Sequence, residues 1–354
     1  METDLTPQPA ATACALPAHY YTDPSMPARD RRAVFDRSWQ LVTHVSRLAQ
    51  PGDHVVADLA GLPVLAVRDE AGQIHVLHNV CRHRAGPIAQ CDGHGARHLR
   101  CRYHGWTYTL DGRLRAAPEM RDAAGFDMAT VRLPALAVRV WQGLVFAAVD
   151  ADLAPPFDAM VEGIAERLGA GHALERYGQH HRVSYDIDCN WKVYVDNYLE
   201  GYHVPFVHPG LNQLLDYRSY RTELSRWHSL QWSPLESAPS LYGNGDALYY
   251  WLWPNTMLNI LPGRLQTNTV IPLGVGRCRV VFDSYYAEGD DARRDADVAF
   301  SDQVQHEDIG ICEDVQRGLA SGSYVPGRLN PLRETGVHHF HELLRAAYRA
   351  DTAP

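Results

Sequence analysis

Two short cysteine–histidine motifs, seventeen residues apart, constrain this chain more than any other feature. The first reads CRH and supplies Cys81 and His83, and the second reads CRYH and supplies Cys101 and His104. Each loop offers one thiolate and one imidazole, which matches a Rieske-type [2Fe–2S] cluster with two cysteines on one iron and two histidines on the other. A structural zinc site is the alternative, although zinc fingers usually place the cysteine pair and the histidine pair on separate elements.

A second group of potential ligands begins about a hundred residues downstream. The segment 190–209 reads NWKVYVDNYLEGYHVPFVHP and contains His203 and His208, and Glu307, Asp308 and Glu313 follow about a hundred residues later. Two histidines and one carboxylate are the ligand set of a mononuclear non-haem Fe(II), which keeps positions open for O2 and substrate. Because the chain contains nineteen histidines, this pair is informative mainly in combination with the upstream motifs.

With these two ligand sets, the chain resembles the oxygenase (alpha) component of the Rieske non-haem iron oxygenases from about residue 37 onward. The segments that carry the resemblance are NVCRHRAGP, CRYHGWTYTLDGRL, NWKVYVDNYLEGYHVPFVHP, WPNTMLNILPG and EDIGICEDVQRGL. Within that family it is most similar to the branch that acts on carnitine, choline, glycine betaine and other quaternary ammonium compounds. The resemblance implies that a separate flavin- or ferredoxin-type reductase delivers electrons from NAD(P)H, and that the chain forms a homotrimer.

The resemblance also implies roles for individual residues around the iron. It makes Asp308 the third ligand, with Glu313 as the alternative. The position three residues before His203 is a carboxylate that bridges the two metal centres in this family. Most members have Asp there, whereas this chain has Glu200, as the carnitine-type branch does. Asn197 matches a residue near the iron that can hydrogen-bond to water or oxygen.

Aromatic side chains near the predicted iron site are candidates for the substrate pocket. They are Tyr198, Tyr202 and Phe206 in the histidine segment, and Tyr249, Trp251 and Trp253, whose alternation predicts a common face of one strand. Aromatic faces attract quaternary ammonium groups, although aromatic residues on a strand are also ordinary core residues. Arg264 is a candidate partner for a substrate carboxylate.

Three functions are compatible with these features. The first is hydroxylation of a quaternary ammonium compound with O2, which leads to N-demethylation or C–N cleavage. The second is ring hydroxylation or O-demethylation of an aromatic acid by the same metal centres. The third is an electron carrier that uses the cluster alone, which the second ligand set and the long chain beyond the cluster motifs disfavour.

Composition bounds the class of protein. The chain has 354 residues, of which 45% are hydrophobic and 21% charged, and no run of residues resembles a membrane span. A net charge of −9 argues against nucleic acid as a partner. The cysteines outside the cluster motifs show no framework spacing, which is typical of reduced thiols in a cytoplasmic enzyme. Several arginines near the cluster motifs are candidates for a docking face for an acidic electron donor.

The pattern of elements predicts an α+β fold with three parts. Residues 1–37 form an arm and a helix that join the catalytic domain, 38–150 form a small antiparallel β Rieske domain, and 151–354 form the catalytic domain. That domain is expected to pack helices against a central antiparallel sheet, and the resemblance gives it the name helix-grip-like. Helices are expected at 29–39, 155–169, 191–202, 296–319 and 334–348, and strands at 183–187, 249–261, 266–272 and 279–287.

Overall fold

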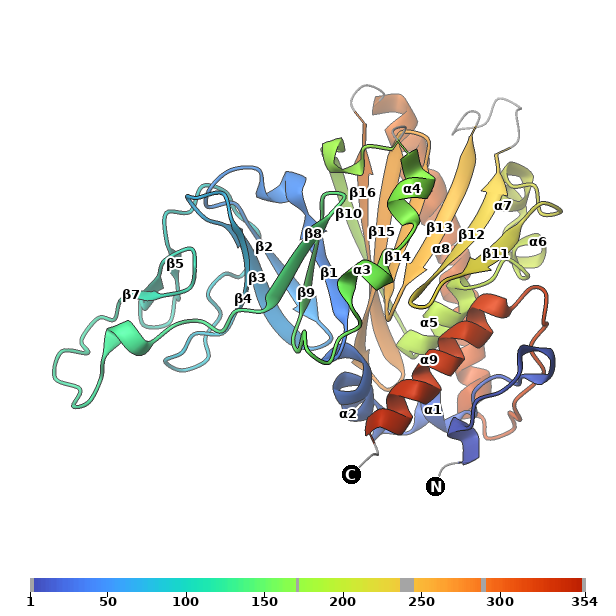
Figure 1. Ribbon diagram of the computed structural model, residues 1–354, viewed down its shortest axis with the longest axis horizontal. Coiled ribbons are helices and arrows are strands. Elements are labelled where there is room, and N and C mark those ends of the chain that lie inside the picture. The colour runs from blue at the N-terminus through green and yellow to red at the C-terminus, as the bar shows by residue number, and fades with distance from the viewer. Residues whose placement is uncertain (1–2, 170–171, 236–244, 288–290, 352–354) are drawn as a thin grey trace. The chain divides into compact units, whose positions relative to one another are not determined.

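The computed structural model describes residues 3–169, 172–235, 245–287 and 291–351, and the chain divides into two compact units (Figure 1). The smaller unit comprises Arg37–Ala154 and Leu174–Arg176, and the larger unit comprises the rest. Apart from the short segment Leu174–Arg176, the chain therefore changes unit at 36/37 and 154/155, where the sequence analysis expected boundaries at 37/38 and 150/151. Among the described residues, no helix combines the length and apolar character needed to cross a membrane.

The smaller unit is built from three antiparallel sheets, in the strand orders β1-β9-β8, β2-β3-β4 and β5-β6-β7. The central strands β3 and β9 are almost wholly buried, which explains their continuous runs of apolar residues. The third sheet and the loops beside it share one hydrophobic cluster. The strands are β1 (Trp39–His44), β2 (His54–Leu59), β3 (Leu62–Arg68), β4 (Ile74–His78), β5 (Leu99–Arg100), β6 (Thr107–Tyr108), β7 (Leu114–Ala116), β8 (Ala137–Trp141) and β9 (Leu144–Ala148).

The larger unit contains a seven-stranded antiparallel sheet in the order β10-β16-β15-β14-β13-β12-β11. Its central strands β14 and β15 are buried yet carry several amide side chains, and these side chains line a pocket. The strands are β10 (Gln179–Ile187), β11 (Arg221–Leu224), β12 (His228–Pro234), β13 (Asp246–Leu252), β14 (Thr256–Leu261), β15 (Arg264–Gly274) and β16 (Arg277–Tyr286).

The larger unit also contains helices, of which α5 contacts β15 and β16, α9 contacts β11, and the long helix α8 runs alongside the strands (Figure 1). They are α1 (His19–Thr22), α2 (Met26–Asp30), α3 (Phe157–Met160), α4 (Ile164–Leu168), α5 (Trp191–Tyr198), α6 (Val204–Val207), α7 (Pro209–Leu214), α8 (Asp291–Ala320) and α9 (Thr335–Asp351), with a π-helical turn at Arg31–Phe35. Short 3-10 turns lie at Thr3–Leu5, Ala10–Thr12, Val45–Leu48, Met128–Thr130 and Leu174–Arg176.

A buried ion pair ties the N-terminal arm to the rest of the larger unit. The Asp30 carboxylate accepts hydrogen bonds from Lys192 Nζ at 2.6 Å, from Trp191 Nε1 at 2.7 Å and from the hydroxyl of Tyr348. These partners lie at the start of α5 and in α9, so three segments distant in sequence meet at one carboxylate. The arm is thus an integral part of the larger unit.

Several expected elements differ from the structure. The helix expected at 29–39 ends at Phe35, and Trp39 instead begins β1, where it pairs with Ala148. The helix expected at 155–169 is two short helices, because Gly163 takes a left-handed conformation (φ 76°) between them. The strand expected at 249–261 is the hairpin of β13 and β14, and the helix expected to reach residue 202 ends at Tyr198.

Candidate metal centres and substrate pocket

The two cysteine–histidine motifs of the smaller unit form two loops with the same backbone hydrogen bonds. The amide of Cys81 donates to the carbonyl of Gly86, five residues on, and the amide of Cys101 donates to that of Trp106. A residue with positive φ closes each loop, Ala85 (58°) in the first and Gly105 (73°) in the second. The two loops therefore share a backbone frame, although the histidine follows the cysteine by two residues in the first loop and by three in the second.

The two cysteines of the motifs lie next to each other, and the two histidines do so as well. Burial raises the pKa of the Cys101 thiol, and a hydrogen bond with the Cys81 thiol raises it further. The rings of His83 and His104 lie 4.6 Å apart, centroid to centroid, and His83 Nδ1 is buried without a hydrogen-bond partner. A buried imidazole nitrogen with no partner and a nearby thiol pair suit metal ligation.

The pairs fit two irons better than one zinc ion. Four ligands of a tetrahedral zinc lie within about 4 Å of one another. In the described part of the chain, His203, His208 and Asp308 form the one group of three or more potential ligands whose donor atoms all lie within 4.8 Å, and the four cluster residues form no such group. Tyr108 adds a further contact, because its hydroxyl lies 3.3 Å from Cys81 Sγ and accepts the amide hydrogen of Arg82.

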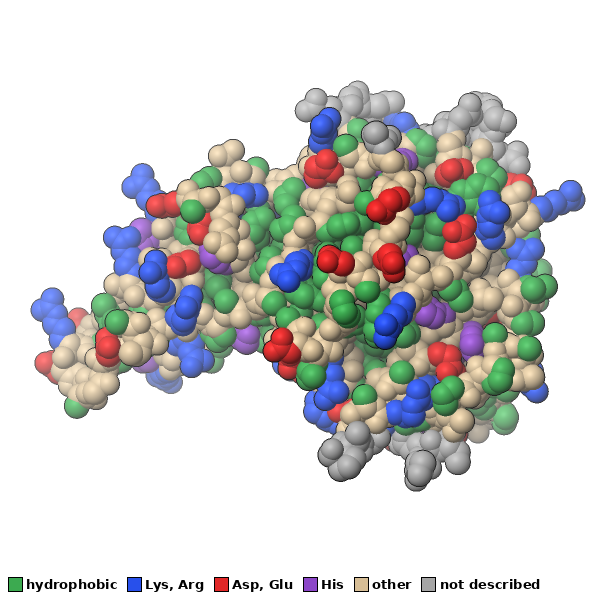
Figure 2. Space-filling model, in the orientation of Figure 1, with side chains coloured by type: hydrophobic (Ala, Val, Ile, Leu, Met, Phe, Trp, Pro, Cys, Tyr) green, Lys and Arg blue, Asp and Glu red, His purple; other side chains and the backbone are tan. Residues whose placement is uncertain are grey.

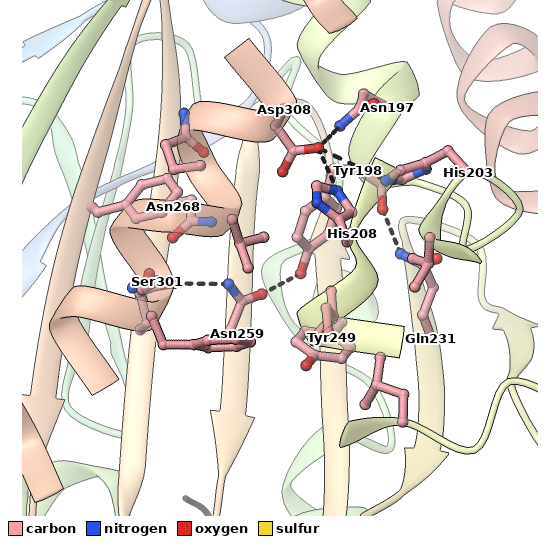
Figure 3. Close-up of a pocket in the computed structure, with 18 of the residues that line it drawn as sticks. Asn197, Tyr198, His203, His208, Gln231, Tyr249, Asn259, Asn268, Ser301 and Asp308 are labelled. Carbon is pink, nitrogen blue, oxygen red and sulfur yellow. Dashed lines mark hydrogen bonds and ion pairs between the residues drawn. The ribbon is translucent and has the colours of Figure 1, made fainter. Parts of the chain in front are cut away.

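The second ligand set of the larger unit converges on one carboxylate oxygen (Figure 3). His203 lies at the start of α6 and His208 at its end, so this short helix sets the spacing of the two rings. Asp308 projects from the middle of α8, and its Oδ1 lies 3.0 Å from His208 Nε2 and 3.7 Å from His203 Nε2. Three donors on one side of a small space are the arrangement that a mononuclear Fe(II) requires.

A carboxylate contacts the Nδ1 atom of each of these two histidines. Glu200 Oε1 lies 2.6 Å from His203 Nδ1, and Glu307 Oε2 lies 2.7 Å from His208 Nδ1. Such contacts fix the orientation and tautomer of an imidazole and leave its Nε2 to face a metal. Burial lowers the pKa of His208, but Asp308 and Glu307 together outweigh it and raise that pKa.

Glu200 and Asn197 both contact side chains of the predicted ligand set. The second oxygen of Glu200 accepts the amide hydrogens of Tyr202 and His203, so this carboxylate is held on both sides. Asn197 Nδ2 donates to Asp308 Oδ1 at 2.6 Å. Glu313, the alternative ligand, lies elsewhere and accepts a hydrogen bond from the amide of Asp188.

A pocket of about 120 Å³ opens beside His203, His208 and Asp308 and extends along the sheet (Figure 3). Its aromatic lining is Tyr194, Tyr198, Tyr220, Tyr249, Phe282 and Phe300. Its amide and hydroxyl lining is Asn197, Gln231, Asn259, Gln266, Asn268, Ser301 and Gln305. Three of these polar groups form a chain of hydrogen bonds with Tyr198: Tyr198 donates to Asn259, Asn259 to Gln266, and Gln266 to Ser301.

Four of the six aromatic candidates for the substrate pocket, Tyr202, Phe206, Trp251 and Trp253, are not among the residues that line it. Phe206 is 80% exposed on α6. Trp251 shares a face of β13 with Tyr249 but lies two residues further along, about 7 Å away, where it packs against Phe340 of α9. Trp253 packs against the same ring. Tyr198 and Tyr249 do line the pocket. Trp253 lies just beyond the end of β13, so the alternation did not bring the three residues of this segment to one site.

Sequence reasoning missed the contact of Glu307 with His208 and the amide wall of the pocket. Glu307 stands next to Asp308 on an acidic stretch of helix, which reads as a solvated surface. Asn259, Gln266 and Asn268 interrupt strands that are otherwise apolar. Polar residues inside a buried central strand were the available signal for a pocket on that face.

Comparison with known proteins agrees with the two ligand sets. Residues 38–135 match the Rieske [2Fe–2S] domain family, and residues 174–350 match the ring hydroxylating alpha subunit (catalytic domain) family. The chain is 36% identical to choline monooxygenase of Arabidopsis thaliana over 97% of this chain and 85% of the relative. It is 31% identical to the carnitine monooxygenase oxygenase subunit of Escherichia coli over 95% and 94% of the two chains.

Solved structures give the same result. A structure of the quaternary ammonium Rieske monooxygenase CntA superposes with a TM-score of 0.89 at 26% identity, covering 97% of this chain and 99% of that one. Naphthalene 1,2-dioxygenase from Rhodococcus, at 19% identity and a TM-score of 0.80 over 96% and 95% of the chains, shares the fold. The chain belongs to the Rieske non-haem iron oxygenases, as an oxygenase component with a [2Fe–2S] cluster and a mononuclear iron.

Proposed function

We propose that this enzyme is a monooxygenase that hydroxylates a quaternary ammonium compound. The observation that carries the proposal is the pocket beside His203, His208 and Asp308, which six aromatic rings line. Aromatic faces attract a trimethylammonium group by about 0.5–2 kcal/mol per contact. The choline and carnitine monooxygenases among the relatives support the same substrate class.

We assign Cys81, His83, Cys101 and His104 to the cluster, and His203, His208 and Asp308 to the iron. The iron, when bound, supplies the activation of O2. Overall, one oxygen atom enters a substrate C–H bond and the other leaves as water, which consumes two electrons and two protons. If the C–H bond belongs to an N-methyl group, the product is a hemiaminal, which breaks down to formaldehyde and the demethylated amine.

The residues around the iron site hold its ligands in place. Glu200 and Glu307 orient the two imidazoles through their Nδ1 atoms. Asn197 donates to the Asp308 oxygen that faces both histidines, and so restrains that carboxylate. The pocket's aromatic rings place the substrate next to this site and exclude bulk water from it.

Electrons reach the enzyme from NAD(P)H through a separate reductase. The arginines near the cluster loops support a docking face for an acidic donor, since Arg82, Arg84, Arg97, Arg100, Arg102, Arg113 and Arg115 are all exposed. Arginine side chains are also prominent on the smaller unit, which contains no lysine (Figure 2). A structure of CntA is described as giving insights into inter-subunit electron transfer. We infer a homotrimer in which Glu200 bridges the metal centres of two subunits. We also infer a cytoplasmic location, which is supported by the five cysteines outside the cluster motifs, since none of them forms a disulfide.

The test is turnover with a compatible reductase and a panel of compounds. Choline, carnitine, glycine betaine and proline betaine represent the cationic class, and benzoate and aryl methyl ethers represent the aromatic alternative. NADH oxidation, formaldehyde and the hydroxylated or demethylated products are measured together. Turnover of cationic compounds alone is expected, whereas turnover of aromatic compounds alone contradicts the proposed substrate class.

Iron content tests the electron-carrier alternative on the same preparation. A cluster plus a mononuclear iron gives three irons per chain, whereas a carrier contains two. A value of two together with no turnover of any compound contradicts an oxygenase.

A further inference from the structure

A buried ion pair lies in the wall of the substrate pocket. Arg264 of β15 lines the pocket, and its Nε lies 2.7 Å from Asp297 Oδ2 of α8. The two side chains are 7% and 2% exposed. The hydroxyl of Tyr286 also donates to Asp297 Oδ2, at 2.6 Å. The positive charge of Arg264 is therefore neutralised within the protein before any ligand arrives.

The ion pair lies at the end of the pocket that is remote from the iron site. Three residues at alternate positions of β15 line the pocket. They are Asn268, Gln266 and Arg264, and they form a row that ends at Arg264. Along α8, Asp297 precedes the proposed ligand Asp308 by eleven residues, or about 16 Å of helix. A substrate whose trimethylammonium group faces the iron site would direct its other end toward Arg264.

The charges that line the pocket are unevenly distributed. Arg264 is the only lysine or arginine among the described residues that line it, and Glu200 and Asp308 lie at the iron end. The segments outside the described ranges contain no lysine or arginine in the sequence. Between the two ends, amides such as Asn259 and Gln266 offer hydrogen bonds without net charge. A substrate carboxylate entering this pocket would find no cation that is not already paired.

We propose that Asp297 determines the charge class of the substrate. By neutralising Arg264, it restricts the pocket to quaternary ammonium compounds whose remaining part is uncharged, such as an alcohol or amide, and excludes those with a carboxylate. A carboxylate that is buried without a cationic partner loses its hydration, and no attraction to a cation compensates for that loss. This inference rests on the proposed function, because it concerns the substrate of the same pocket.

The first test uses the unmodified enzyme and pairs of compounds that differ only in charge. The pairs are glycine betaine with its amide and carnitine with its amide, and choline is the neutral reference. We expect kcat/KM for each amide to exceed that for its carboxylate by more than about tenfold. Equal values, or a preference for the carboxylates, overturn the inference and leave the proposed function standing. Turnover of no cationic compound overturns the proposed function and the inference with it.

The second test changes the ion pair. Asp297→Asn leaves Arg264 able to pair with a substrate carboxylate, so the amide-to-carboxylate ratio is expected to fall at least about tenfold. Tyr286→Phe is the matched control, because it removes a hydrogen bond to Asp297 without releasing Arg264, and it should keep the original ratio. An unchanged ratio in a folded Asp297→Asn enzyme contradicts the inference. If that variant does not fold, the compound pairs on the unmodified enzyme still decide.

Discussion

The two metal centres are built in opposite ways. The cluster ligands lie within twenty-four residues, 81–104, and matched backbone hydrogen bonds of two loops position them. The iron-site residues come from α5, the short helix α6 and the middle of α8, and span more than a hundred residues. A local centre depends on its own loops, whereas a dispersed centre depends on the packing of a whole unit. A substitution in one unit should therefore remove the metal centre of that unit and leave the other metal centre intact.

The largest effect is expected from Asp308→Ala. Loss of the third ligand should empty the iron site, lower the iron content from three to two per chain and reduce turnover by more than about a thousandfold. The visible and EPR spectra of the cluster should not change, because its ligands lie in the smaller unit. The control is Glu313→Ala, which removes a different carboxylate of the same helix. Iron loss in that control, with iron retained in Asp308→Ala, would mean that the third ligand is misassigned.

The reverse separation is expected from Cys101→Ser. The cluster and its spectrum should be lost, turnover should cease, and the mononuclear iron should remain at one per chain, because the larger unit holds it independently. Cys91→Ser alters an exposed cysteine of the same unit and should keep the cluster. Iron analysis and visible spectroscopy decide the matter, and a Cys101→Ser enzyme with an intact cluster would contradict the assignment.

A smaller but still large loss is expected from Glu200→Gln. The amide keeps the shape of the side chain but removes the charge that holds His203 Nδ1 at 2.6 Å. If Glu200 bridges the centres, both metals stay bound while electron transfer to the iron slows by about a hundredfold or more. Rapid mixing of reduced enzyme with O2 and substrate measures this rate. A normal rate would show that Glu200 serves only as a support for His203.

The smallest of these effects is expected from Glu307→Gln. This change weakens the contact with His208 Nδ1, so the affinity for Fe(II) should fall about 10–100-fold. Turnover should recover when excess Fe(II) is added, which distinguishes this variant from Asp308→Ala. The check is a titration of the metal-free enzyme with Fe(II), and an unchanged affinity would assign no role to Glu307.

This contrast explains what the sequence could predict. The cluster loops were recognisable because spacing alone places their ligands, and the mixed sheet and helix content was readable from periodicity. The contact of Glu307 with His208 depends on the rotation of α8 about its axis, which an acidic run does not reveal. The positions of Trp251 and Trp253 depend on where α9 crosses the sheet. Arg264 was recognisable as a cation, but its pairing with Asp297 required the fold.

The most direct test of the central claim is a single turnover without reductase. Enzyme reduced under anaerobic conditions stores one electron at each metal centre, so mixing it with O2 and choline should give up to about one product per chain. The account predicts this yield for the unmodified enzyme and none for Asp308→Ala. Product from the Asp308→Ala enzyme, or product from benzoate but from no quaternary ammonium compound, would contradict it.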